Sequence, residues 1–156
     1  MSDTAFYCVA DDRYFLGAVG LINSLRLVGH GEPVYLLDCG LRSDQRELLS
    51  AEATLVAAPA QAPPTMLKTI APLAHPADVM VLIDTDMIVT RALSEPIAEA
   101  RRGCAVGFED VVDRHLPEWG ALLGLGPLRR HRYLSFGLLA IDRRKGTEVL
   151  QLLGEL

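Results

Sequence analysis

Apolar residues in this chain fall into short runs separated by stretches in which they recur at helical spacing. Runs of this length, bounded by Gly, Pro, Asn, Asp or Ser, are typical of strands, and strands that alternate with helices indicate a layered α/β sheet with mostly parallel strands. The chain shows no repeat and no linker, so we expect one domain over residues 1–156. The predicted strands are 5–10, 33–38, 53–57, 78–89, 104–108 and 133–141.

Helices are predicted between these strands. Apolar residues at 15, 19, 22 and 25 lie on one helical face, and Gly29 predicts where that helix ends. A second helix should begin after Ser43 as its N-cap. A third should begin at Thr65 and end or kink near Pro72, because proline removes a helical hydrogen bond. Two more are predicted over 94–102 and 147–156, whereas 116–127 follows no clear pattern.

The most informative run is 78–89, in which two carboxylates one residue apart, Asp84 and Asp86, interrupt apolar residues. A continuous apolar run predicts a strand buried on both faces. On an extended backbone, the two acids would project to the same side. Two such anions repel each other unless a cation or a proton lies between them. We therefore predict a hard divalent cation that shares its remaining positions with water and phosphate. A solvated turn at the strand end is the alternative.

Acidic residues also follow two other predicted strands. Asp11 and Asp12 follow the first strand, and Glu109 and Asp110 follow the fifth. In open α/β sheets, ligands bind beyond the carboxyl ends of the strands, so three acidic clusters predict a site on one rim. Asp11 could instead cap the helix that follows it.

Composition and charge narrow the class of protein. The chain has 156 residues, half of them hydrophobic, and a net charge of −5. This charge argues against nucleic acid as a partner, because nonspecific nucleic-acid binding requires excess Lys and Arg. No apolar stretch approaches the roughly 20 residues of a transmembrane segment. The three cysteines, Cys8, Cys39 and Cys104, are expected in strands, lack CxxC spacing, and fit reduced, buried thiols. We expect a cytoplasmic protein without a transmembrane segment.

Four segments, 9–14, 67–68, 81–89 and 133–141, resemble in sequence and order the N-terminal, nucleotide-binding half of a GT-A fold glycosyltransferase. The similarity is greatest to family 8, the glycogenin and bacterial galactosyl- and glucosyltransferase type. It implies a Rossmann-like GT-A fold, with a mostly parallel central sheet flanked by helices, that is incomplete at its C-terminus.

The resemblance also implies a function: transfer of a hexose from a UDP-sugar, with retention, to an unknown saccharide, lipid-linked saccharide or protein. Asp84 and Asp86 match the family's DxD motif, which binds Mn²⁺ or Mg²⁺. Asp11 matches the acid that receives uracil and ribose, Tyr14 could face the base, and Lys68 matches a basic position near the donor. The implied donor-binding residues are Ala10, Asp11, Tyr14, Lys68, Asp84, Thr85, Asp86, Ser135, Phe136 and Gly137. No catalytic residue is assigned.

The chain departs from the family pattern at two points. Ser135 replaces an Asn and Phe136 replaces a small residue beside the donor sugar. The family also takes a His metal ligand and much of its acceptor site from beyond residue 156. A catalytically incomplete nucleotide-sugar-binding or assembly domain, in a homo-oligomer or with a missing C-terminal half, is therefore an alternative. We expect uncovered apolar surface near 147–156.

A phosphatase similar to the haloacid dehalogenases is a second alternative, with Asp84 as nucleophile. That family places its DxD near the N-terminus and usually follows it with Gly-Thr or Gly-Val. Here Met87 and Ile88 follow, late in the domain.

Overall fold

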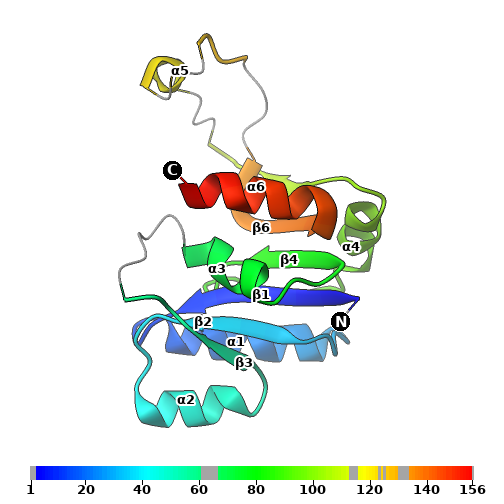
Figure 1. Cartoon of the computed structure of the whole chain (residues 1–156). Coiled ribbons are helices and arrows are strands. Elements are labelled where there is room, and N and C mark those ends of the chain that lie inside the picture. Colours follow the sequence, from blue (N-terminus) through cyan, green and yellow to red (C-terminus); the bar gives the residue numbers. More distant parts are fainter. Residues whose placement is uncertain are drawn as a thin grey trace.

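A computed structural model of the chain describes residues 3–60, 67–112, 116–122, 124, 126–129 and 134–155. Its centre is a six-stranded sheet in the order β3-β2-β1-β4-β6-β5 (Figure 1). The strands are β1 (Thr4–Ala10), β2 (Val34–Asp38), β3 (Thr54–Ala57), β4 (Val79–Ile83), β5 (Val106–Glu109) and β6 (Leu134–Asp142). The helices are α1 (Phe15–Leu27), α2 (Ser43–Ser50), α3 (Leu67–Ala74), α4 (Ser94–Arg101), α5 (Glu118–Leu122) and α6 (Arg143–Glu155).

The sheet is mostly parallel, as predicted. β1 pairs in parallel with β2 and with β4, and β2 pairs in parallel with β3. β6 is antiparallel to both of its neighbours, β4 and β5. β6 therefore runs opposite to the other five strands, whose carboxyl ends share one edge. The Rossmann-like α/β fold class is confirmed.

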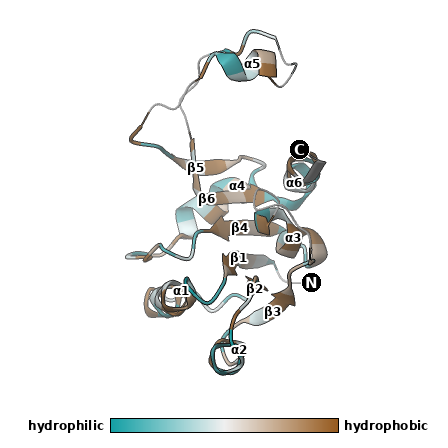
Figure 2. Ribbon diagram, turned by 90° about the vertical axis from the view of Figure 1, so that its left-hand side faces the viewer, coloured by the Kyte–Doolittle hydropathy of each residue, from teal (hydrophilic) through white to brown (hydrophobic). Residues whose placement is uncertain are grey.

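Two layers of helices cover the sheet. One apolar cluster joins Phe6 and Val81 to residues of α1, α2 and α4. The second joins Tyr7 and Leu82, which point to the opposite face, to residues of α3 and α6. Figure 2 shows α1 on one side of the sheet and α3 and α6 on the other. All five residues of β4 are buried, which explains its unbroken apolar sequence.

Several predicted boundaries were wrong. β4 ends at Ile83 instead of continuing to residue 89, because residues 84–87 form a turn. Ser43 is the first residue of α2 and not its N-cap; the Gln45 amide oxygen accepts the N–H of Arg42 instead. α6 begins four residues before the predicted start at 147, because Asp142 Oδ1 accepts the N–H groups of Arg144 and Lys145.

Other predictions held. α1 ends where expected, with Gly29 at φ 93°, a conformation that favours glycine. α3 spans Leu67–Ala74 and ends two residues after Pro72. The predicted start of this helix at Thr65 and the predicted start of the last strand at Tyr133 lie outside the described residues. The three cysteines are free, but only Cys8 is buried; Cys39 and Cys104 lie outside the strands.

Exposed apolar side chains occur on several elements, and those on α6 and α5 bear on the predictions. On α6, Val149 and Leu152 are 46% and 63% exposed, which agrees with the surface expected there. α5, in the segment that had no clear pattern, stands away from the sheet (Figures 1 and 2) and exposes Trp119 and Leu122. Among the described helices, none has the length and apolar content needed to cross a membrane.

Candidate functional site

A cleft of about 430 Å³ opens at the carboxyl ends of β1 and β4. It brings together side chains or backbone from the ends of both strands, from the start of α1 and from α3. Its lining contains seven of the predicted donor-binding residues: Ala10, Asp11, Tyr14, Lys68, Asp84, Thr85 and Asp86. Val9, Cys39 and Leu67 complete it.

Asp84 and Asp86 lie in a turn, so the premise of an extended backbone was wrong. The carbonyl oxygen of Asp84 accepts the N–H of Met87 at 3.2 Å, and the Asp84 N–H donates to Gly137 O at 2.8 Å. Thr85, between the two acids, is buried and donates its hydroxyl to Val9 O at 3.1 Å. These bonds attach the turn to β1 and β6 while both acids still line the cleft.

Lys68 enters the cleft from the first turn of α3. Its ammonium forms an ion pair with Asp84 Oδ1 and donates to the carbonyl oxygen of Phe136 at 2.9 Å. The same nitrogen lies 4.9 Å from the centre of the Phe136 ring. Lys68 therefore pairs with an acid of the site.

Ser135, Phe136 and Gly137 do not line the cleft, but Gly137 contacts Asp84 and Phe136 contacts Lys68. Ser135 Oγ accepts the N–H of Gly137 at 3.2 Å. A β-carbon added to Gly137 would lie 3.3 Å from Ser135 Oγ and 3.5 Å from Asp84 Oδ2, so this glycine packs closely beside the carboxylate. Gly137 and Phe136 therefore contribute to the site through Asp84 and Lys68, and Ser135 contacts Gly137.

Asp11 closes the turn before α1 and also faces the cleft. Its Oδ1 accepts the N–H groups of Arg13 and Tyr14, at 2.9 and 3.0 Å, which is the capping role considered as the alternative. Asp12 instead pairs with Arg42. Tyr14 is 52% exposed and so presents its ring to solvent at the cleft.

The predicted rim of three acidic clusters is reduced to two. Glu109 and Asp110 do not line the cleft, because β6 lies between β4 and β5 in the sheet. The order of the strands in the sheet, which the sequence does not reveal, therefore excludes Glu109 and Asp110 from the cleft.

Cys39 is a site residue that sequence reasoning missed. It follows β2, and its N–H donates to Ala10 O at 2.9 Å. Burial raises the pKa of the Cys39 thiol, and the charges of Asp38 and Asp11 raise it further, so it stays protonated at neutral pH. The sequence could have indicated this residue, because Cys39 directly follows a parallel strand and ligands bind beyond the carboxyl ends of such strands.

No family model and no curated protein sequence matches the chain. Its structure, however, is similar to solved glycosyltransferases. Two structures of LgtC superpose on it: the active-site mutant Q189E at TM-score 0.68 and 18% identity, and the galactosyltransferase with donor and acceptor sugar analogues at TM-score 0.66 and 17%. The bifunctional glycosyltransferase WbbM superposes at TM-score 0.66 and 17% identity.

The chain has a glycosyltransferase fold. The match covers 92% of this chain but 59% of LgtC, and 97% of this chain but 33% of WbbM. The chain therefore spans less than two thirds of the proteins it resembles. At these identities the likeness concerns the fold alone.

The acids of this glycosyltransferase-fold cleft suit a divalent cation. Asp84 and Asp86 offer the hard oxygen ligands that Mg²⁺ and Mn²⁺ prefer. The carboxylate of Asp84 already contacts one cation, the ammonium of Lys68. Among the described residues, no third His, Cys, Asp or Glu joins them. Such a cation would take its remaining positions from water and phosphate.

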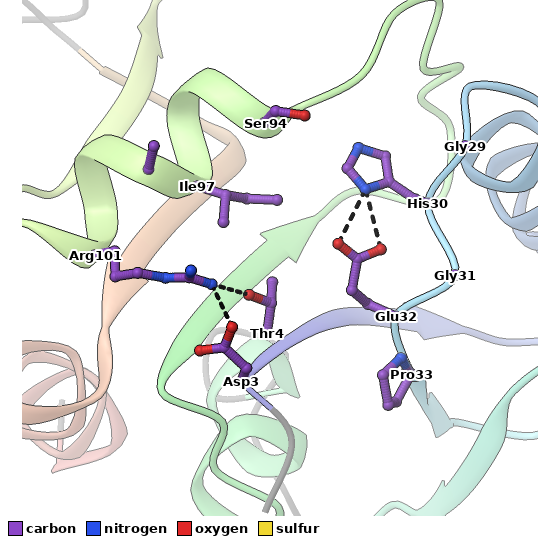
Figure 3. A pocket seen from close by; sticks show the side chains of 11 residues that line it. Asp3, Thr4, Gly29, His30, Gly31, Glu32, Pro33, Ser94, Ile97 and Arg101 are labelled. Atoms are coloured by element: carbon purple, nitrogen blue, oxygen red, sulfur yellow. Dashed lines mark hydrogen bonds and ion pairs between the residues drawn. The ribbon is translucent and has the colours of Figure 1, made fainter.

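A larger hollow, of about 590 Å³, lies at the opposite edge of the sheet (Figure 3). The charged side chains labelled there pair with one another. Arg101 donates to Asp3 at 2.8 Å and to Thr4 at 3.1 Å, and His30 Nδ1 lies 3.1 Å from Glu32. Because His30 Nε2 also accepts the N–H of Leu93 at 2.8 Å, these contacts tie α4 to β1 and β2. We assign them a structural role.

Proposed function

We propose that this chain forms the donor-binding part of a metal-dependent, retaining glycosyltransferase that moves a hexose from a UDP-sugar. The observation that supports this best is one cleft in a glycosyltransferase fold that joins Asp84 and Asp86 to Asp11, Tyr14 and Lys68. The acceptor, whether a saccharide, a lipid-linked saccharide or a protein, stays open.

Each residue has a role suited to its place. Asp84 and Asp86 would hold Mn²⁺ or Mg²⁺, which would neutralise the diphosphate as it leaves. Asp11 would accept hydrogen bonds from the ribose or uracil, and the exposed ring of Tyr14 would stack on the base. Lys68 would pair with a phosphate oxygen.

A binding domain without turnover is the second candidate. It is favoured by the two-acid cation site and by Phe136, whose ring stands next to Lys68 at the edge of the site. A phosphatase has less support, since the LgtC and WbbM structures that superpose on the chain are glycosyltransferases.

Calorimetry with UDP and Mn²⁺ tests the donor site. We expect the double substitution Asp84→Asn with Asp86→Asn to abolish UDP binding, because the remaining groups cannot hold the cation that bridges to the diphosphate. Asp44→Asn with Asp78→Asn is the matched control: it makes the same change of charge at exposed positions outside the cleft and should leave binding intact.

Unchanged UDP affinity in the Asp84 and Asp86 variant would refute the donor site. Release of UDP from a UDP-sugar by the purified chain would separate the two candidates, since a binding domain should show none.

A further inference from the structure

Lys68 occupies the position next to Asp84 where a cation would bind. Its ammonium contacts three groups: Asp84 Oδ1, Phe136 O and the Phe136 ring. The lysine side chain is 28% exposed and that of Asp84 is 36% exposed. The ammonium therefore rests in a partly enclosed place built by α3, by the turn after β4, and by β6.

This arrangement differs from a solvated surface ion pair. An ammonium has three donors, and here one meets a carboxylate and another meets a backbone carbonyl that is fixed within β6. Phe136 adds an aromatic face, which attracts a cation. The ring of Phe136, which departs from the family pattern, thus forms part of the surroundings of the Lys68 ammonium.

We propose that the ammonium of Lys68 occupies the cation position at Asp84 while the cleft is empty and thereby weakens the binding of a divalent metal. When a diphosphate binds, the ammonium moves to it and leaves Asp84 available to the metal. This inference rests on the proposed function. A divalent ion held by Asp84 would bind directly to its carboxylate oxygens. At that place it would repel an ammonium that contacts the same carboxylate.

A diphosphate removes this conflict. Its oxygens give the flexible, compact ammonium of Lys68 a new anionic partner, and Asp84 becomes free for the metal. Metal and UDP should therefore strengthen each other's binding, and by linkage the effect is reciprocal. Metal alone should bind weakly.

The test is a titration with Mn²⁺ alone, in which electron paramagnetic resonance reports the free ion. We expect Lys68→Met to bind Mn²⁺ about thirtyfold more tightly than the wild type, the effect of removing a unit charge about 4 Å from a divalent ion in a hydrated site. Lys145→Met is the matched control. It removes the only other lysine, which contacts Gly103 O outside the cleft, and should leave Mn²⁺ affinity unchanged.

Two further measurements keep the test decisive. Lys68→Arg, which retains the charge, should bind Mn²⁺ as weakly as the wild type, whereas a loss of packing would affect both Lys68 variants. The enhancement of Mn²⁺ affinity by UDP should be smaller in Lys68→Met than in the wild type.

Equal Mn²⁺ affinity in Lys68→Met and Lys145→Met would overturn the inference. The proposed function fails separately, if UDP and Mn²⁺ still bind after Asp84→Asn with Asp86→Asn. Loss of binding in that double variant, together with unchanged Mn²⁺ affinity in Lys68→Met, overturns only the role of Lys68.

Discussion

Substituting Gly17 by alanine should destabilise the protein, although helix propensity alone predicts the opposite. Gly17 lies inside α1, where alanine is normally better by about 0.5–1 kcal/mol. A β-carbon at this position, however, would lie 2.5 Å from the carbonyl oxygen of Thr85 and 3.2 Å from its carbonyl carbon. These are backbone atoms of the turn that carries Asp84 and Asp86, so they cannot rotate away.

The change in stability of Gly17→Ala depends on whether the cost of overpacking exceeds the gain in helix propensity. Overpacking of this kind costs about 1–3 kcal/mol, so the net loss should be about 1–2 kcal/mol. Gly20→Ala on the same helix is the control: its β-carbon would lie 3.1 Å from Ile88 Cδ1, the end of an exposed side chain that can move. That variant should keep most of the gain in helix propensity. The two variants should differ by about 2 kcal/mol.

Urea unfolding measures this difference. With a dependence on urea of about 2 kcal/mol per M, the midpoint of Gly17→Ala should lie about 1 M below that of Gly20→Ala. The affinity for UDP and Mn²⁺ should also fall in Gly17→Ala, because the displaced turn carries both acids. Equal stability of the two variants would show that α1 does not press against Thr85 as described.

Two more predictions concern the surroundings of the cleft. Thr85→Val should lower the free energy of unfolding by about 1–3 kcal/mol, since it removes the hydroxyl that donates to Val9 O. Thr85→Ser keeps the hydroxyl and should lose less stability. An equal loss in the two variants would contradict the role of this hydrogen bond. Burial acts to raise the pKa of Asp38, but hydrogen bonds from Arg46, Leu41 and Gly40 outweigh it and hold the pKa below the ordinary 3.8. Because the folded pKa is the lower one, this contribution to stability is present above pH 4 and is lost as the pH falls through the folded pKa. Asp38→Asn should therefore lose less stability than the wild type between pH 6 and pH 3 in urea unfolding, and an identical loss would contradict this reading.

Much of the fold could be predicted because it depends on local patterns. β4 reads as an unbroken apolar run because both of its faces are buried. α1 reads as a helix because Ile22 and Leu25 recur on the face that packs against the sheet. The errors lie at boundaries, where one capping contact shifts an end: Asp142 starts α6, and the turn at Asp84 stops β4.

The site could be predicted where its residues come directly after strands. Asp11, Asp84 and Asp86 were expected on one rim, and the parallel pairing of β1 with β4 places them in one cleft. Glu109 was expected there for the same reason, but the insertion of β6 between β4 and β5 separates it from the others.

The order of residues along the chain is enough to predict that two acids follow a buried strand, and it shows a lysine and an aromatic residue elsewhere in the chain. That Lys68 contacts Asp84, and that Phe136 of β6 contacts the lysine, becomes apparent from the packing of the elements. The reason is physical. A hydrophobic period is set by neighbours a few residues away, whereas the contact between residues 68 and 136 depends on which strand lies beside β4 and on the depth at which α3 packs against the sheet.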